Sequence, residues 1–474
     1  ESMLSRPIDF GVFPDHGAAQ FYDRRARSIP AMFRFTARDT VAWAWLMLKT
    51  WTAGRRAELA YARRNAAECW QRFLTPTAAR TWRACFGPWI GSDWTRVSLH
   101  HAGRFFQKQL TSRPAHYHPA DRDGPGWWHG AGDGWLLLRA PSSEAWFERW
   151  IPYLQSRGVQ FRWLSPLAKL DFDGARITGA TLADQGRVAA DYYVLATNPF
   201  ATARILRGTP DLERLPELRN FQPLVQDGPH TQVSFRLAFT EAIAFPRDRT
   251  AVVVADSEFN LTLFAEEQVW PADVPLGQGV RSLWTGTSCA GEVPGRLYGR
   301  PVIHCTEEEF IAEVVAQILS CGALDRLVRE ANGGRGLAEF RMARVEVWDE
   351  WRFSRSGIQP RQPKWVTTTH TQPHLPKQAT PVPNLALAGA HTRTEADVWS
   401  IEGAVESGRR AARVFDRRVG VLPQYRPAWM RCLAVLDNAC HAVGLPHILD
   451  LAAAVLLLLG VVALALGLRA LWSP

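Results

Sequence analysis

The chain has 474 residues, 47% of them apolar and 21% charged, which excludes a disordered protein and leaves room for two or three domains. Its 55 Lys and Arg exceed its 46 Asp and Glu, and the resulting net charge of +9 favours anionic partners. The basic residues are scattered, without a run of five or more, so we expect no nucleic-acid partner. The seven cysteines form no CxxC pair and indicate neither a disulfide framework nor a structural zinc site.

The N-terminal segment, residues 1–129, is predicted to be the mainly helical first part of a substrate domain. Residues 40–51 and 56–73 are long stretches of Ala, Trp, Leu and Arg with few helix breakers, which is typical of helices. Residues 112–134 are rich in Pro and Gly and predict loops. His116 and His118 lie there without a third ligand at a fitting distance, so we expect no metal site.

The next segment, residues 130–205, predicts a helix, a short strand and a β-meander. The helix is expected over 142–157, with Ser142 or Ser143 as its N-cap. Strands are expected at 159–163, 168–172, 176–183, 188–190 and 192–196. Gly130, Gly132 and Gly134 superficially resemble a phosphate loop, but no strand precedes them, so they form only a weak dinucleotide signature.

Residues 206–379 combine strand and helix patterns and predict the second, mixed part of the substrate domain. Strands are expected at 232–239, 251–254 and 341–347, and a helix at 306–320. Six prolines between 359 and 383 predict an extended, non-helical segment.

Residues 380–418 predict a strand, a glycine turn and a helix. An apolar strand at 385–387 leads into Gly389, and Ser400 is the expected N-cap of a helix whose first turn contains Glu402. An open helix N-terminus after a strand and a glycine turn can bind an anion or an electron-rich heteroatom. On spacing alone, a tightly packed strand-turn-helix unit without a ligand is an equally good interpretation.

The C-terminal segment, residues 425–474, predicts a membrane anchor. Residues 451–468 form an uncharged apolar run long enough for a spanning helix, and residues 427–445 carry apolar residues at helical spacing, as an interfacial helix would. The alternative is a C-terminal helix that packs on a partner or in a dimer.

Residues 384–413 resemble the C-terminal flavin-binding motif of the FAD-dependent amine oxidase and carotenoid desaturase superfamily, because an apolar strand and Ala-Gly are followed by S-x-E-G-A-x-x-S-G. Residues 130–199 are similar to the superfamily's middle FAD segment, through Gly158-Val159, Ala190-Asp191 and Ala196 among others. The resemblance implies an α/β plus α+β fold. Its parts would be a Rossmann-like FAD/NAD(P)-binding domain of the glutathione-reductase type, incomplete at the N-terminus, a mixed substrate domain and a C-terminal hydrophobic helix.

The resemblance also implies the cofactor, FAD, and the residues that contact it. Gly389 and Ala390 would lie at its ribityl–pyrophosphate portion, Leu167 at the adenine, and Ala196 and Thr197 along the diphosphate. The helix N-terminus, Ser400, Ile401, Glu402, Gly403 and Ala404, would face the pyrimidine edge of the flavin. The positive helix end there would stabilise negative charge on the reduced flavin.

Two features depart from the superfamily pattern. Ala390 stands where an acidic residue is usual, and no strand–GxGxxG–helix unit is found in the sequence. Because Glu1 is not a natural start, we attribute the missing unit to truncation. If the natural protein also lacks this unit, we expect FAD binding to be weak.

The predicted function is an FAD-dependent oxidoreductase that desaturates or dehydrogenates an apolar, isoprenoid- or carotenoid-like lipid at a membrane. The motif spelling is nearest to the phytoene and ζ-carotene desaturases, and the squalene-pathway dehydroxylases stay open. One alternative is an amine or porphyrinogen oxidase, and another is a non-catalytic, membrane-tethered lipid-binding protein on a degenerate flavin fold.

No catalytic acid or base is identified from the sequence, although Lys364 and His391 are candidates. The expected partners are a hydrophobic small molecule and membrane lipid, and the electron acceptor is open. We expect a membrane-associated protein whose catalytic part lies on the cytoplasmic or plastid stromal side. The tryptophans of residues 82–94 are expected to belong to the core rather than to a substrate tunnel.

Overall fold

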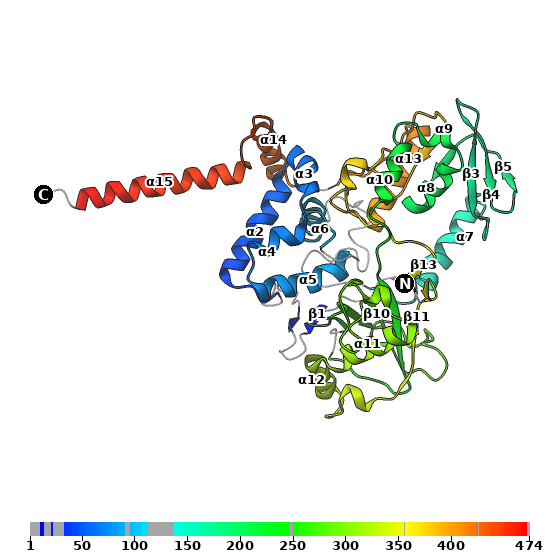
Figure 1. The fold of residues 1–474 in the computed structure, drawn as a ribbon, viewed down its shortest axis with the longest axis horizontal. Coiled ribbons are helices and arrows are strands. Elements are labelled where there is room, and N and C mark those ends of the chain that lie inside the picture. Colours follow the sequence, from blue (N-terminus) through cyan, green and yellow to red (C-terminus); the bar gives the residue numbers. More distant parts are fainter. Residues whose placement is uncertain are drawn as a thin grey trace.

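The structure is a computed structural model that describes residues 10–13, 20–21, 33–90, 95–111, 137–246, 250–354, 356–424 and 426–471. It contains a helical region, a lobe built on a large sheet, a second lobe of small sheets and helices, and a projecting C-terminal helix (Figure 1). The predicted phosphate-like glycines (Gly130, Gly132, Gly134) and the pair His116 and His118 lie outside the described residues.

The helical region packs around an aromatic core. Its helices are α2 (Ala37–Thr52), α3 (Arg55–Leu59), η1 (Tyr61–Arg63), α4 (Ala66–Gln71), α5 (Pro76–Ile90) and α6 (Leu99–Thr111). Trp82 is fully buried, with the rings of Phe33, Trp70 and Phe106 centred 4.7, 5.2 and 4.7 Å from its own. The prediction that Trp82 belongs to the core is confirmed.

The helical character predicted over residues 56–73 is confirmed, and it is divided among three short helices, α3, η1 and α4. Asn65 has extended backbone and starts a new helix, since its side chain accepts hydrogen bonds from the amides of Ala67 and Glu68. The amide of Ala66 donates to the Val97 carbonyl. A contact with a segment 30 residues away therefore interrupts the helix.

The larger lobe is a seven-stranded sheet with the order β11-β7-β10-β9-β8-β1-β2. Its strands are β1 (Phe10–Phe13), β2 (Gln20–Phe21), β7 (Val233–Phe239), β8 (Ala251–Val254), β9 (Leu261–Ala265), β10 (Ser282–Ser288) and β11 (Met342–Val347). Only the β1–β8 pair is parallel among the described strand pairs of this sheet. The strands predicted at 232–239, 251–254 and 341–347 are confirmed.

The two faces of this sheet are covered differently. Val233, Phe235 and Leu237 alternate along β7 and share a core with α11 (Glu307–Leu319) and α12 (Gly322–Ala331). On the opposite face, the helical region covers β1 and β8. The part of that opposite face formed by β7 and β10 borders a cavity. Shorter elements of this lobe are η6 (Glu266–Gln268), η7 (Val302–His304), η8 (Leu337–Glu339), β12 (Trp351–Ser354) and β13 (Gly357–Pro360).

The second lobe joins segments from the middle and the end of the chain (Figure 1). It contains η4 (Ser143–Phe147), α7 (Glu148–Ser156), β3 (Leu167–Phe172), β4 (Ile177–Leu182), β5 (Arg187–Val188), β6 (Tyr193–Leu195), α8 (Pro199–Arg207), α9 (Pro210–Glu213), η5 (Leu218–Asn220), α10 (Phe221–Val225), η9 (Gln372–His374), β14 (Leu385–Leu387) and α13 (Ile401–Phe415). One hydrophobic core runs from Leu170 on β3 through Leu195 on β6 to Leu387 on β14.

Two local predictions in this lobe are wrong. Ser142 makes no capping hydrogen bond, because its backbone is already helical and the chain begins with a π-turn. Residues 159–163 are not a strand: they are largely exposed, and Phe161 and Trp163 stack on each other at 5.3 Å. Without a neighbouring strand, this β-type pattern forms no ladder.

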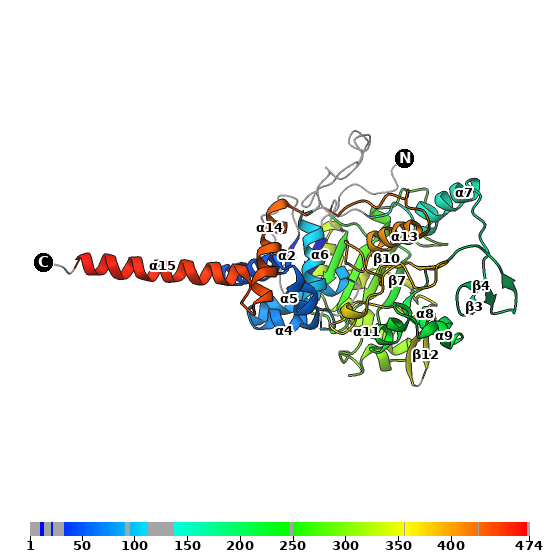
Figure 2. The ribbon, with the colours of Figure 1, turned by 90° about the horizontal axis from the view of Figure 1, so that it is seen from above.

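The chain ends in α14 (Ala428–Ala442) and α15 (Ile448–Leu471). α14 packs on α2 and α3, whereas α15 projects from the body in both views (Figures 1 and 2). Over the part of the chain that the structure describes, no helix is long and apolar enough to cross a membrane. The spanning segment predicted at 451–468 is therefore not found there, although a hydrophobic C-terminal helix is present.

Replacing Trp82 by Ala should lower the free energy of unfolding by about 3–5 kcal/mol, because it opens a cavity among the packed rings of Phe33, Trp70 and Phe106. Trp163→Ala is the matched control, since that side chain is 65% exposed. Urea unfolding followed by circular dichroism measures both variants, and equal losses would show that Trp82 is not a core residue.

Candidate functional site

The site is built on two parallel strands that are far apart in the sequence. Leu195 on β6 is in register with Leu387 on β14, and the Ala388 amide donates to the Leu195 carbonyl at 2.9 Å. The carboxyl ends of both strands therefore meet at one edge, which is where open α/β sheets bind ligands. The predicted residues Ala196 and Thr197 come directly after β6, and Gly389 and Ala390 follow β14.

Gly389 makes the turn out of β14. Its φ is +133°, and a Cβ at this position would lie 2.4 Å from Cε1 of His391. Its amide donates to Oγ of Ser407 on α13 at 2.7 Å. A side chain at position 389 would be strained and would collide with the His391 ring, so only glycine fits this turn.

The N-terminus of α13 lies beside this turn. Oγ of Ser400 accepts from the Gly403 amide at 3.1 Å, which confirms the predicted N-cap. A Cβ on Gly403 would lie 2.6 Å from the Val398 carbonyl oxygen, so this helix end is tightly packed. Ile401 and Glu402, in the first turn, are exposed. The positive end of the helix is thus available to a negatively charged or electron-rich group.

His391 shows that this site is suited to a ligand. Its ring is 2% exposed, and Nε2 has no hydrogen-bond partner among the described residues. Burial lowers the pKa of His391 to about 4, so the imidazole is neutral at physiological pH. The rings of Phe221 and Trp365 lie 5.5 and 6.2 Å away. A buried imidazole nitrogen without a partner among the described residues, beside the turn at Gly389, fits a cofactor that brings its own polar atoms.

Most of the predicted cofactor residues are brought together, and Leu167 is the exception. Ala196, Thr197, Gly389 and Ala390 share the strand edge, and the segment from Ser400 to Ala404 forms the adjoining helix end. Leu167 begins β3 in a different sheet and is connected to β6 and β14 only through the shared core. In that sheet, Ile177 contacts Asn384, which precedes β14 at the opposite end from Gly389.

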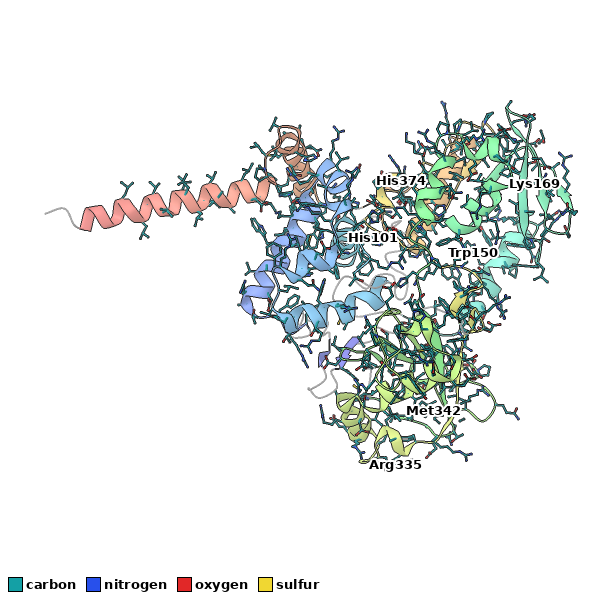
Figure 3. The ribbon with its side chains drawn as sticks, in the orientation of Figure 1. His101, Trp150, Lys169, Arg335, Met342 and His374 are labelled. Carbon is teal, nitrogen blue, oxygen red and sulfur yellow. The ribbon has the colours of Figure 1, made fainter. Side chains whose placement is uncertain are left out.

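Asp397, which the sequence pattern does not single out, connects residues 384–413, the segment that resembles the flavin-binding motif, with the helical region. Its carboxylate lies 2.5 Å from Nε2 of His100 on α6 and accepts from Gln372 Nε2 at 3.1 Å. Its φ is +47°, an uncommon conformation for a residue other than glycine. Figure 3 shows His101 and His374 where α6 approaches this segment. The only hint in the sequence is that Asp397 lies three residues before the helix cap.

A second missed residue, Glu406, holds the loop that precedes α13. Its buried carboxylate accepts from the amides of Glu395 and Ala396 at 2.7 and 2.9 Å, and from Arg410 Nε at 2.6 Å. The two bonds from the loop amides thus fix the loop to the helix that follows it, and hold the helix N-terminus in place.

Lys364 joins the two lobes. Its Nζ donates to Oε1 of Gln232, and Nε2 of Gln232 lies 3.2 Å from Sγ of Cys289. Burial lowers the pKa of Lys364 to about 8. The adjacent Trp365 contacts the ring of Trp399 at 5.1 Å, close to the α13 cap. The consecutive residues Lys364 and Trp365 thus contact the sheet lobe and residues 384–413, respectively.

A cavity of about 530 Å³ lies on the sheet, and its lining residues Ser234 and Thr287 are two positions from Gln232 and Cys289 in the sequence. It is lined by Ser234, Phe235, Arg236, Phe264, Thr285, Gly286, Thr287, Glu346, Val347, Trp348 and Asp349. This volume suits a small organic molecule, and the wall contains hydroxyl groups and charges of both signs.

Comparison with known proteins agrees with this geometry. The sequence profile of flavin-containing amine oxidoreductases matches residues 61–414, so the chain belongs to that family. No curated protein sequence matches the chain. The solved structures that it resembles include cyclohexylamine oxidase from Brevibacterium oxydans IH-35A, with 13% identity, a TM-score of 0.51 and coverage of 87% of this chain and 81% of that one.

Two further structures share the fold. A triple mutant of putrescine oxidase with redesigned cofactor binding has 12% identity, a TM-score of 0.56 and coverage of 87% and 82%. An oxidoreductase from Methanosarcina mazei has 10% identity, a TM-score of 0.50 and coverage of 85% and 79%. At these identities the likeness shows the fold alone, which is the mixed α/β fold of FAD-dependent amine oxidases.

Membership in this family makes the chain an FAD-dependent oxidoreductase rather than a non-catalytic lipid-binding protein. FAD supplies the acceptor for a hydride equivalent removed from the substrate. The residues that would hold it are those after β6 and β14 and the first turn of α13, next to the buried nitrogen of His391. The expected FAD contacts of the individual residues stay predictions.

Gly389→Ala should weaken FAD binding by about tenfold or more, because the new Cβ meets the His391 ring and the backbone φ is unfavourable for Ala. Gly408→Ala on α13 is the control, since a Cβ there meets nothing within 4 Å. Titration of the protein with FAD, followed by flavin fluorescence, compares the two. Unchanged affinity in Gly389→Ala would show that the cofactor does not approach this turn.

Asp397→Asn should remove a pH dependence of stability. The pKa of Asp397 is lowered to about 2 from an ordinary 3.8, where the His100 imidazole and the nearby Arg104 outweigh the opposing effect of burial. A lowered carboxyl pKa gives stability that is present above about pH 4 and is lost as the pH falls towards 2, here about 2 kcal/mol.

The measurement is the free energy of urea unfolding between pH 5 and about pH 2. The wild type should lose this increment and the Asn variant should not. Asp211→Asn, whose side chain is 86% exposed, serves as the control. Parallel acid profiles for wild type and Asp397→Asn would contradict the assignment.

Proposed function

We propose that this enzyme oxidises a polar amine-type substrate that binds in the cavity on the sheet. The observation that carries the proposal is the set of hydroxyl and charged groups that the cavity wall contains beside its apolar surface. An isoprenoid hydrocarbon could not use these groups, whereas an amine can form hydrogen bonds with them. The titles of two similar structures name cyclohexylamine oxidase and putrescine oxidase.

The polar groups form a line along two paired strands. Thr285 on β10 is in register with Arg236 on β7, and Thr287 with Ser234. The line continues to the contact between Gln232 and Cys289 and ends at Lys364. From position 236 to position 232 a strand advances about 13 Å. A substrate with polar groups at both ends would therefore lie with one end at Lys364 and the other at Arg236.

The far end of the line carries charges of both signs. Glu346 is in register with Arg236, and Asp349 also lines the cavity. Glu346 and Asp349 form ion pairs with Arg344 and Arg361, at 2.8 and 3.9 Å. These groups favour a polar ligand that can form hydrogen bonds, rather than a ligand of one particular charge.

Lys364 is the residue that we propose to handle the proton of the amine. An alkylammonium ion must lose a proton before its nitrogen lone pair is available. With a pKa of about 8, Nζ of Lys364 is partly neutral near that pH and can accept the proton. Gln232 holds the amine of Lys364 in place through its side-chain oxygen.

Oxidation of an apolar isoprenoid lipid is the second candidate, and the exposed apolar surface of α15 favours it. The large apolar side chains described as exposed run from Val455 to Leu466, over a length of roughly 17 Å. This length corresponds to about one leaflet of a bilayer. We propose that α15 enters one leaflet and attaches the enzyme to a membrane, with the catalytic lobes in the cytoplasm or plastid stroma.

The test is anaerobic mixing of the FAD-loaded enzyme with a monoamine, a diamine or a micellar polyene hydrocarbon. Loss of the visible flavin absorption with an amine supports the first candidate, and loss with the polyene alone overturns it in favour of the second.

We expect Lys364→Met to slow the reaction with amines about a hundredfold and to flatten its rise with pH around 8.

Lys377→Met is the control, because Lys377 belongs to the same segment of the chain and is exposed. It should react at the wild-type rate. Equal rates for Lys364→Met and the wild type would remove Lys364 from the mechanism while leaving the substrate class to be decided by the mixing experiment.

A further inference from the structure

α14 has two faces of different character. Met430, Ala434 and Asp437 are buried against the helical region. Trp429, Leu436 and Val443, each seven residues from the next, are 48%, 52% and 70% exposed. Residues seven apart lie on one side of a helix. Hence α14 presents a line of large apolar side chains to its surroundings, which we call the α14 stripe.

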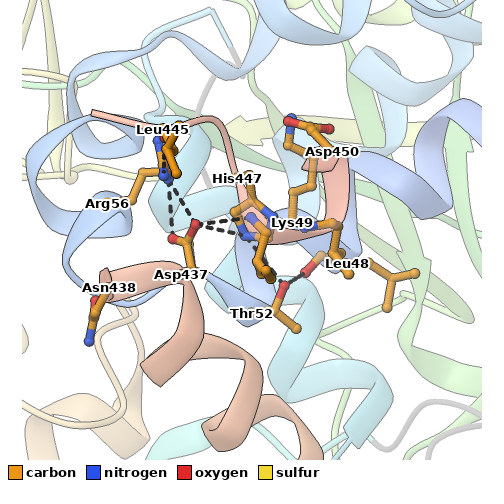
Figure 4. A network of polar contacts seen from close by, with 12 residues as sticks. Leu48, Lys49, Thr52, Arg56, Asp437, Asn438, Leu445, His447 and Asp450 are labelled. Carbon is orange, nitrogen blue, oxygen red and sulfur yellow. Dashed lines mark hydrogen bonds and ion pairs between the residues drawn. The ribbon is translucent and has the colours of Figure 1, made fainter. Parts of the chain in front are cut away.

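The attachment of α14 to the body prevents the stripe from turning inwards. Asp437 is fully buried, and both of its carboxylate oxygens lie 3.1 Å from Nε of Arg56, which donates a hydrogen bond shared between them. Arg56 also donates to the Leu445 carbonyl at 2.9 Å (Figure 4). Oδ1 of Asn438 accepts from the Arg55 amide at 2.6 Å. Rotating the helix would leave Asp437 as an unpaired buried charge, which costs several kcal/mol.

Apolar side chains are also exposed near the base of α15. Asp450 at the start of α15 forms an ion pair with Lys49 of α2 at 2.5 Å and accepts from Nε1 of Trp45 at 3.2 Å. Trp45 is partly exposed, and Val41, one turn earlier on α2, is 69% exposed. The exposed apolar groups of α2 therefore lie on the side of the body from which α15 projects (Figures 1 and 2).

We propose that the α14 stripe, together with Val41 and Trp45, is a second lipid-contact surface, which lies at the boundary between headgroups and acyl chains of the leaflet that receives α15. This inference rests on the proposed membrane attachment and adds the orientation of the body. Both α15 and the exposed side of α14 would contact the membrane. The helical region would then face the membrane, and the sheet lobe would lie in water.

Three observations favour lipid over a second copy of the chain. The exposed residues of α15, among them Val455, Leu456, Leu457 and Leu458, are consecutive and so surround the helix, and one protein face cannot cover all sides of it. Arg431 on α14 and Arg38 on α2 are exposed, and the single acidic residue of α14 is buried, which suits anionic headgroups. Tryptophan is enriched at membrane interfaces, because its ring is both apolar and polar.

The experiment is flotation of the full-length protein with vesicles of phosphatidylcholine and phosphatidylglycerol. Trp429→Ser, Leu436→Ser and Val443→Ser are combined, with α15 unchanged. We expect the vesicle-bound to free ratio to fall by about tenfold or more, since three half-exposed apolar side chains no longer leave water. These positions are exposed, so the thermal midpoint of unfolding should stay that of the wild type.

The matched control combines Leu297→Ser, Tyr298→Ser and Leu319→Ser, three exposed apolar side chains on the sheet lobe. It should bind vesicles as the wild type does. If the wild type does not float, the membrane attachment itself fails. If it floats and the α14 variant floats equally well, only the second contact surface is overturned. A wild type that forms dimers which the α14 variant loses, with equal flotation, would assign the stripe to a second copy instead.

Discussion

The parallel pairing of β6 with β14 is the contact on which the cofactor site depends. It joins two strands separated by most of the sheet lobe's sequence and places Thr197 beside Gly389. Asn384 reinforces it, because its carbonyl accepts from the Tyr193 amide at 2.9 Å and its side-chain amide donates to the Asp191 carbonyl at 3.2 Å. Because the turn at Gly389 is anchored to Ser407, the strand edge also sets the position of α13. The helix N-terminus is thus part of the same rigid unit.

The residue that we propose to accept the proton of the substrate, Lys364, lies where this unit meets the sheet lobe. Lys364 and Trp365 occupy consecutive positions in an extended, proline-rich segment, so their side chains point in different directions. One reaches Gln232 at the end of β7, and the other packs against Trp399 beside the helix cap. The extended backbone makes this possible, because a helix would place both side chains on neighbouring positions of one surface. Lys364 and Trp365 thus lie between the cavity on the sheet lobe and the edge formed by β6 and β14.

The helical region has a different role, which is to connect the site with the C-terminal helices. α6 supplies His100 to Asp397 on one side, while α2 and α3 supply Lys49 and Arg56 to the C-terminal segment on the other. These contacts pair charges that are buried or partly buried, where an unpaired partner would be costly. They define one arrangement of the candidate site, the helical region and the C-terminal helices. The direction of α15 therefore follows from the same packing that positions the loop containing Asp397.

The sequence by itself determined the features that depend on neighbouring residues. The strand at 385–387, the Ser400 cap and the glycine turn follow from apolar runs, capping chemistry and backbone freedom, which act within a few residues. Tertiary structure alone decided the break at Asn65, the pairing of His100 with Asp397, and the meeting of Lys364 with Gln232 and Cys289. It also decided that α14 exposes an apolar stripe. Each of these depends on groups tens to hundreds of residues apart, whose approach is set by packing and by the cost of leaving buried polar groups unpaired.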